Sequence, residues 1–215
     1  MKKICKCLIP MLCGIVAGIL ISSALYATTG FSLFGEPPDR LPSYADVDNA
    51  RLAEFAFDIL ELIKERDYAA ISRLAHPEYG VVFSPCATVS FATNKRFSAR
   101  QMAAFGDDKN IYVWGINSIG GDPIEMTPSD YFARYVFDRD YTSAAAVGLN
   151  HIVRSGNALE NITEAFPDAL FVDFHIPGVE KDASEEPEWS SLRLGFEEYN
   201  GTLRLTLILH SERTV

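Results

Sequence analysis

The sequence is poor in the residue clusters that most often carry chemistry. Its four histidines are dispersed, and no His-x-His or Cys-x-x-Cys pair is present, so no metal centre is indicated. No glycine-rich loop is followed by the Lys and the Ser or Thr that hold a phosphate group. We therefore expect no cofactor, and no motif identifies a reaction.

Cysteine is scarce beyond the first residues of the chain. Cys5, Cys7 and Cys13 lie close to the N-terminus, which leaves Cys86 alone in the rest of the sequence. A single thiol excludes a disulfide within that part of the chain. Cys86 could serve as a nucleophile, but no neighbouring residue supplies a base, and free cysteine usually behaves as a small buried hydrophobe. We therefore interpret Cys86 as a packing residue.

Positive charge is also scarce. The chain has 19 Lys and Arg residues against 29 Asp and Glu residues, which gives a formal net charge of −10. Because binding to nucleic acid requires a basic surface, this composition excludes nucleic acid as an expected partner. The apolar fraction of 48% is ordinary for a globular protein and excludes a disordered chain.

The N-terminal segment has the layout of an export signal. Lys2, Lys3 and Lys6 precede an apolar stretch from Leu8 to Tyr26, which approaches the ~20 residues of a membrane-spanning helix. We favour an uncleaved anchor in the cell membrane, with the C-terminal domain outside the cytoplasm. Secretion after cleavage of a signal peptide is the alternative.

This layout divides the chain into three parts. We predict a signal-anchor or signal peptide at 1–27, a proline-containing spacer at 28–43, and a single exported domain at 44–215. The expected contact with the membrane is made through the N-terminal segment.

Apolar periodicity predicts the first elements of the exported domain. Helical spacing predicts a helix at 48–66, followed by a shorter helix that Asp67 caps and that ends near His76. Runs of β-branched and aromatic residues predict strands at 81–83 and 111–114.

Two cap signals predict short helices in the middle of the chain. Ser98 precedes Gln101 at the spacing of a capping box. Thr127 precedes a proline that suits the first position of a helix. The segment 142–167 has no clear periodicity, and we assign no element to it.

The C-terminal third alternates between apolar and polar residues. The segment 170–176 is a predicted strand, and Asn200-Gly201 separates two further alternating runs as a two-residue hairpin turn would. The predicted register places Leu192 opposite Leu209, Leu194 opposite Leu207, and Phe196 opposite Leu205. The expected fold is α+β: an N-terminal helix pair packs on a curved antiparallel sheet that ends in a C-terminal β-hairpin meander, with an elaborated middle segment.

The helix pair through Asp67 and His76-Pro77, together with the hairpin at Asn200-Gly201, resembles the nuclear transport factor 2-like superfamily. Within it, the segments 76–85 and 210–214 look like those of a group of uncharacterised bacterial envelope proteins. The resemblance implies a cone-shaped sheet around helices that encloses a pocket. It implies no single activity, because this fold hosts isomerases, dehydratases and plain binding modules.

Polar residues of the last predicted strands are candidates for a site. Asp173 and His175 lie two apart on one strand and point the same way, so either could transfer protons in a pocket. The alternative is that these side chains form the solvent-exposed face of an antiparallel sheet, where Glu197 pairs with Arg204.

A second set of residues suggests binding. The candidates combine aromatic rings of the middle segment with polar residues of the last strands: Trp114, Tyr135, Arg193, Arg204 and His210. The alternative for the aromatic residues is core packing.

The function expected from these observations is ligand or partner binding without catalysis, by a membrane-tethered or secreted bacterial domain. The partner would be a small molecule, a glycan or an envelope protein, and a homodimer that pairs through the open sheet face is a further possibility. A small exported enzyme of the cone-shaped fold, using Asp173 or His175 for proton transfer, is the alternative.

Overall fold

A six-stranded sheet forms the centre of the computed structural model, which describes residues 44–117, 120–178 and 188–213. The strands lie in the order β2-β1-β8-β7-β6-β5, and of these pairs only β1 and β8 are parallel. The α+β class with a mostly antiparallel sheet is thereby confirmed. The predicted anchor and spacer at 1–43 lie outside the described residues, and within those described no helix is long and apolar enough to cross a membrane.

The helical elements are α2 (Tyr44–Glu65), α3 (Tyr68–Leu74), α4 (Ala99–Met102), α5 (Pro128–Tyr131), the π-helix η1 (Phe132–Val136), the 3₁₀-helix η2 (Tyr141–Ser143) and α6 (Ile162–Ala165). The strands are β1 (Val81–Ser84), β2 (Lys95–Phe97), β3 (Tyr112–Ile116), β4 (Pro123–Met126), β5 (Ala146–Leu149), β6 (Leu170–Ile176), β7 (Ser190–Tyr199) and β8 (Thr202–Glu212).

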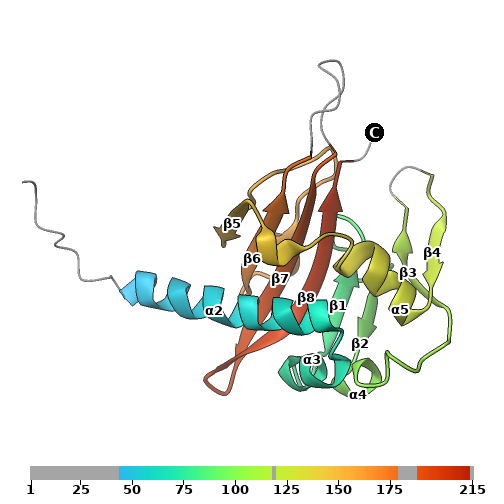
Figure 1. Ribbon diagram of the computed structural model, residues 1–215, viewed down its shortest axis with the longest axis horizontal. Coiled ribbons are helices and arrows are strands. Elements are labelled where there is room, and N and C mark those ends of the chain that lie inside the picture. The colour runs from blue at the N-terminus through green and yellow to red at the C-terminus, as the bar shows by residue number, and fades with distance from the viewer. Residues whose placement is uncertain (1–43, 118–119, 179–187, 214–215) are drawn as a thin grey trace, which may run out of the picture. The chain divides into compact units, whose positions relative to one another are not determined.

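The long helix α2 lies across one side of the sheet, which we call the helix face (Figure 1). Its Phe55 and Phe57 rings meet Phe196 and Phe174 of the sheet edge to face, with centroids 5.5 and 5.1 Å apart. Such pairs stabilise a core beyond the area that they bury. The helix ends at Glu65, and Asp67 then caps α3 by accepting the N–H of Ala70 at 2.9 Å, as predicted.

Aromatic rings fill the helix face beside β1. Trp114 of the β3–β4 ribbon is fully buried, stacks on Tyr131 with centroids 3.8 Å apart, and lies 5.4 Å from the Phe83 ring. The indole N–H of Trp114 donates to the carbonyl of Met126 at 2.9 Å, so its one polar atom is satisfied. This packing places the separate two-stranded ribbon against the main sheet.

The hairpin β7–β8 turns at the predicted residues. Asn200 and Gly201 have φ angles of 51° and 74°, the left-handed conformations that the tightest hairpin turns require. Near the turn, Phe196 lies opposite Leu205, which confirms the predicted register for that pair.

A β-bulge then shifts the register of the hairpin by one residue. Gly195 lies opposite Leu207, so Thr206 is an extra residue on β8. A Cβ atom on Gly195 would lie only 2.9 Å from the Cβ of Leu207, so glycine permits this approach. The predicted pairs Leu192–Leu209 and Leu194–Leu207 are therefore wrong, and the observed pairs are Leu192–His210 and Leu194–Ile208.

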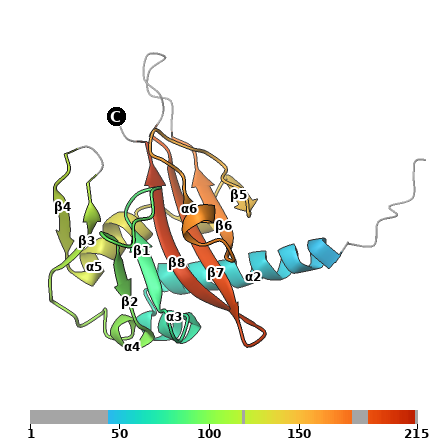
Figure 2. The same ribbon diagram turned by 180° about the vertical axis from the view of Figure 1, so that it is seen from behind.

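The bulge also changes which side of the sheet each later residue of β8 faces. Leu207 and Leu209 pack with Val82 and Phe171 on the side opposite α2, which we call the outer face. Ile208 belongs instead to the core of the helix face. The outer face is covered by α6 and the segments around it (Figure 2), so the sheet is buried on both sides.

Candidate functional site

A cleft opens beyond the C-terminal end of β8, and we call it the Tyr135 cleft. Its volume is about 140 Å³. Its lining residues come from five segments far apart in the sequence: Pro85, Cys86, Ala87, Ile116, Asn117, Ile124, Arg134, Tyr135, Gly156, Ala158, Ser211 and Glu212.

The π-helix η1 brings Arg134 and Tyr135 into this cleft. The preceding helix α5 begins as predicted, because the Thr127 side chain accepts the N–H of Asp130 and a proline follows it. The helix does not end at Tyr131, because the backbone continues directly into the wider turn of the π-helix η1. Turns of π-helix are rare and occur frequently at functional sites. Here the Arg134 guanidinium lies 4.6 Å from the centre of the Tyr135 ring.

Arg134 forms a two-pronged ion pair with Glu212 at the wall of the cleft. Its two terminal nitrogens lie 2.7 and 3.3 Å from the carboxylate oxygens of Glu212. The two side chains remain 45% and 34% exposed, so both can reach a molecule in solution. Burial raises the pKa of Glu212, but His210 and Arg134 outweigh this effect and lower the pKa to about 2. Glu212 is therefore a fixed anion near neutral pH.

His210 supports the ion pair from below. Its side chain is fully buried, and its Nε2 atom lies 3.3 Å from an oxygen of Glu212. Its Nδ1 atom lies 3.7 Å from a carboxylate oxygen of Asp138, which also accepts the hydroxyl of Tyr141 at 2.7 Å. The edge of the Tyr135 ring meets the imidazole, with centroids 5.6 Å apart. His210 thus lies against Glu212 and Tyr135 without reaching the solvent, and neither of its ring nitrogens makes a hydrogen bond to a described residue.

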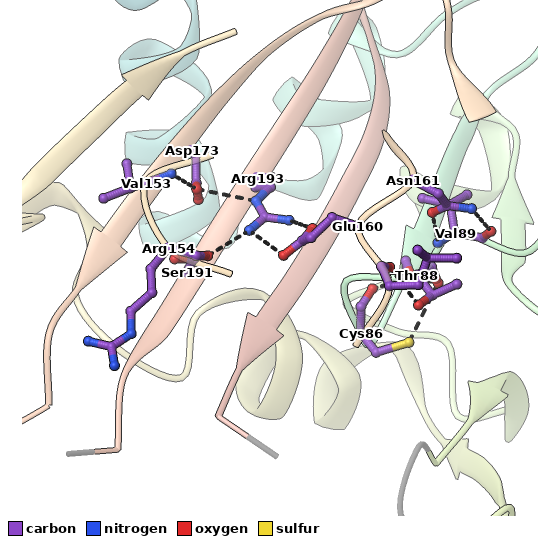
Figure 3. Close-up of polar contacts among 12 residues, drawn as sticks. Cys86, Thr88, Val89, Val153, Arg154, Glu160, Asn161, Asp173, Ser191 and Arg193 are labelled. Atoms are coloured by element: carbon purple, nitrogen blue, oxygen red, sulfur yellow. Dashed lines mark hydrogen bonds and ion pairs between the residues drawn. The ribbon is translucent and has the colours of Figure 1, made fainter. Parts of the chain in front are cut away.

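The outer face carries a second polar network, centred on Arg193 (Figure 3). Arg193 is fully buried, and its guanidinium lies 3.3 Å from Asp173 and forms a two-pronged pair with Glu160. Asp173 also accepts the N–H of Val153 at 2.8 Å, and Arg193 donates to the carbonyl of Arg154 at 3.2 Å. Arg193 and Asp173 are therefore buried together, and Glu160, whose side chain is 13% exposed, closes the network towards the surface.

This network fixes the segment 153–161 against the sheet. The next residues of the segment attach it to the loop after β1: Thr88 donates to the carbonyl of Leu159 at 2.7 Å, and Asn161 exchanges two hydrogen bonds with the backbone of Val89 (Figure 3). Gly156 and Ala158 lie between these attachments and line the Tyr135 cleft. The buried arginine therefore holds one wall of the cleft in place.

The two residues predicted for proton transfer lie on the outer face of β6. Asp173 is fully buried and His175 is 6% exposed, so the interpretation of this face as solvent-exposed is wrong. The His175 Nδ1 atom lies 2.9 Å from the hydroxyl of Ser191, and burial lowers the pKa of His175. Neither Asp173 nor His175 lines the Tyr135 cleft.

The predicted binding residues are distributed over the structure. Tyr135 and His210 are neighbours at the cleft, whereas Arg193 belongs to the buried network and Trp114 to the aromatic core. Arg204 lies opposite Glu197, as predicted, and donates to the carbonyl of Arg73 at 3.0 Å. Cys86, interpreted from the sequence as a packing residue, is half-buried and lines the cleft.

Sequence reasoning missed Arg134, Asp138 and Glu212. Arg134 and Glu212 are 78 positions apart, and they meet only because of the π-helix and the bulge. In the sequence, only the aromatic residues around Arg134 point to a binding site here. They single out Tyr135 and give no reason to select the charged residue beside it.

Comparisons with models of protein families and with curated proteins found no match. Among the described residues, no group of three or more His, Cys, Asp or Glu side chains could hold a metal ion. The cleft itself presents an ion pair, an aromatic ring, a thiol and backbone groups.

Proposed function

We propose that this chain is an exported, non-catalytic binding domain of the bacterial envelope, which takes a small polar ligand in the Tyr135 cleft. The observation that carries the proposal is the half-exposed Arg134–Glu212 pair, which presents a cation and an anion side by side at the cleft wall. The matching ligand is a molecule with a hydrogen-bond donor and an acceptor on adjacent atoms.

The ion pair is organised before any ligand arrives. His210 and Asp138 lie beneath it, and the Tyr135 ring lies against both Arg134 and His210. Groups that are already held in place lose little conformational freedom on binding, and this favours affinity. Arg134 offers donors in a planar fork and Glu212 offers acceptors, so the pair can orient a small ligand.

The same geometry favours binding over proton transfer. A catalytic acid or base works best when its pKa lies near the working pH, whereas the pKa of Glu212 is about 2. The one imidazole of the network, His210, is fully buried. The carboxylate of Asp173, proposed from the sequence as a base, is fully buried beside Arg193 and away from the cleft.

The location of the domain rests on the sequence. The basic head and apolar stretch at 1–27 support a single-pass anchor in the cell membrane, and the alternative is release after signal cleavage. The helices α2 and α3 beside a sheet that ends in the β7–β8 hairpin support the cone-shaped fold of the nuclear transport factor 2-like superfamily.

The proposal is tested by screening small polar molecules against the full-length chain, purified from the membrane fraction or from the medium. Saturation-transfer NMR detects bound ligands and tolerates detergent micelles. We expect Glu212→Gln and Arg134→Met each to weaken a bound ligand about tenfold, equivalent to about 1.4 kcal/mol.

Lys64→Met is the matched control, because it breaks a comparable exposed ion pair, with Asp140, that the cleft does not contain. Affinities that respond equally to all three substitutions, or to none, would refute the assignment of this cleft. Ligand turnover that depends on Asp173 or His175 would show that the protein is an enzyme instead.

A further inference from the structure

The outer face holds another cleft, which lies around the bulge of β8, and we call it the Thr206 cleft. Its volume is about 200 Å³. The residues that line it come from β1 and the turn before it, from the loop after β1, from β2, from the end of α6 and from both strands of the hairpin: Tyr79, Gly80, Val82, Phe91, Arg96, Ala165, Phe166, Glu197 and Thr206. None of them lines the Tyr135 cleft.

Exposed aromatic rings form the walls of this cleft. Tyr79 is 58% exposed and Phe91 is 64% exposed, which places them among the most exposed large apolar residues of the described chain. The Phe91 ring meets Phe166 edge to face, with centroids 5.4 Å apart. Rings that stay in contact with water at the mouth of a cleft are typical of a binding surface.

Tyr79 is held rigidly in this position. Its ring stacks on His76, with centroids 4.6 Å apart, and the Nδ1 atom of His76 accepts the backbone N–H groups of Glu78 and Tyr79. Gly80 completes the turn with a φ of 70°, and a Cβ atom there would lie 2.2 Å from the carbonyl oxygen of Phe97. The turn therefore presents Tyr79 in one orientation.

Three polar side chains of the cleft have no partner among the residues that the structure describes. Thr206 is 2% exposed, and its hydroxyl makes no hydrogen bond to any described residue. A buried hydroxyl without a partner is unfavourable, so the bulge holds this group at an energetic cost. Arg96 and Glu197 also line the cleft, and no hydrogen bond or ion pair of either side chain is found among the described residues.

We infer that the Thr206 cleft binds one pyranose ring of a glycan. A pyranose has an apolar C–H face that stacks on aromatic rings such as Tyr79 and Phe91. Its hydroxyl groups both donate and accept hydrogen bonds, which suits a free guanidinium, a free carboxylate and an unpartnered hydroxyl in one cleft. A lipid tail would leave Arg96, Glu197 and Thr206 unsatisfied.

Charge further restricts the ligand. Glu197 stands in the cleft and the chain has a net charge of −10, so a polyanion would be repelled. A neutral sugar avoids this repulsion and still uses Arg96 as a donor. The inference is independent of the proposed ligand of the Tyr135 cleft, because the two clefts share no residue.

Saturation-transfer NMR on the full-length chain tests the inference. The probes are the methyl glycosides of glucose, galactose, mannose and N-acetylglucosamine, with their short oligomers, and benzoate serves as an aromatic probe without a sugar. We expect saturation of the ring protons on the C–H face of at least one sugar. Phe91→Ala and Thr206→Val should each weaken that sugar about tenfold.

Leu159→Ala is the control, because Leu159 is 70% exposed and lies outside the cleft. Glu212→Gln should leave sugar binding unchanged, which separates this result from the test of the Tyr135 cleft. Circular dichroism establishes that Thr206→Val is folded, and the exposed Phe91 provides a second variant that does not depend on the bulge. No sugar binding at millimolar concentration, binding that neither variant weakens, or binding of benzoate alone would overturn the inference.

Discussion

Two arginines of this protein form two-pronged ion pairs with glutamates, and they differ in their access to water. Arg193 and Asp173 are fully buried and Glu160 is 13% exposed, whereas Arg134 and Glu212 remain 45% and 34% exposed. The Arg134–Glu212 pair lines the Tyr135 cleft, whereas the Arg193 network lies outside it and holds the 153–161 segment, whose Gly156 and Ala158 line it.

The difference shows which charges can act on a ligand. A sealed ion pair loses the solvation of its charges and fixes a structure, and the loss of one partner leaves a buried charge behind. An exposed pair contributes little to stability but can exchange its partner for a ligand. By this criterion Arg193, which sequence reasoning had placed among the binding residues, has a structural role.

Arg193→Met provides the sharpest test of this contrast. It leaves the buried Asp173 without its cation and removes the partner of Glu160, so we expect a loss of about 3–5 kcal/mol in the free energy of unfolding, measured by chemical denaturation. The reaction rate of Cys86 with a maleimide should rise, because the 153–161 wall loosens beside it. Adding Asp173→Asn and Glu160→Gln should restore part of the stability. A loss under about 1 kcal/mol would remove the distinction between the two arginines.

Glu212→Gln should have a smaller effect on stability, of about 1 kcal/mol or less near neutral pH, because the pair is partly exposed. The pKa of Glu212 is about 2 in the folded protein against 4.5 for the free side chain. The folded protein thus binds this proton less readily than the unfolded chain. The stabilising contribution is full above about pH 4.5 and is lost as the pH falls towards 2. Wild type and variant should differ above this window and converge below it.

His175→Gln should have the smallest effect, and only in acid. Burial lowers the pKa of His175 below its usual 6.5, so the unfolded chain binds this proton more readily than the folded protein. The wild type should therefore lose stability as the pH falls below about 6.5, and the variant should lose less. If the free energies of unfolding of the two proteins change equally with pH between 7 and 5, folding does not change the pKa of His175, and the prediction is wrong.

The sequence predicts features that depend on a few neighbouring residues. The Asp67 cap, the Ser98–Gln101 capping box and the Asn200-Gly201 turn are all present, because each requires only contacts within about four positions. The strands β2 and β5 were not predicted. They are three and four residues long, and they form through pairing with distant strands instead of by local preference.

The candidate site was predictable only in part, for the same reason. Asp173 and Arg193 lie opposite each other on neighbouring strands, and the alternation of polar and apolar residues predicts that both lie on the same face of the sheet. Their burial, in contrast, depends on the segment 153–161, to which the sequence assigned no element. Glu212 is the last residue of β8, and beyond the bulge the sequence placed the register of this strand one residue away from its observed value. A shift of one residue exchanges the two faces of a strand. The sequence of β8 alone therefore could not predict on which face of the sheet the Glu212 carboxylate lies.

The extra residue of β8 has a consequence for how the chain can vary in length. Because Leu207 already lies opposite Gly195, removing Thr206 would give a regular ladder in which His210 and Glu212 keep their partners on β7 and face the same side as before. Removing one residue between the bulge and His210 would instead turn His210 and Glu212 away from Tyr135. Relatives that keep the Tyr135 cleft should therefore keep the spacing between the bulge and the end of the strand, whereas the loss of the extra residue should alter the Thr206 cleft alone.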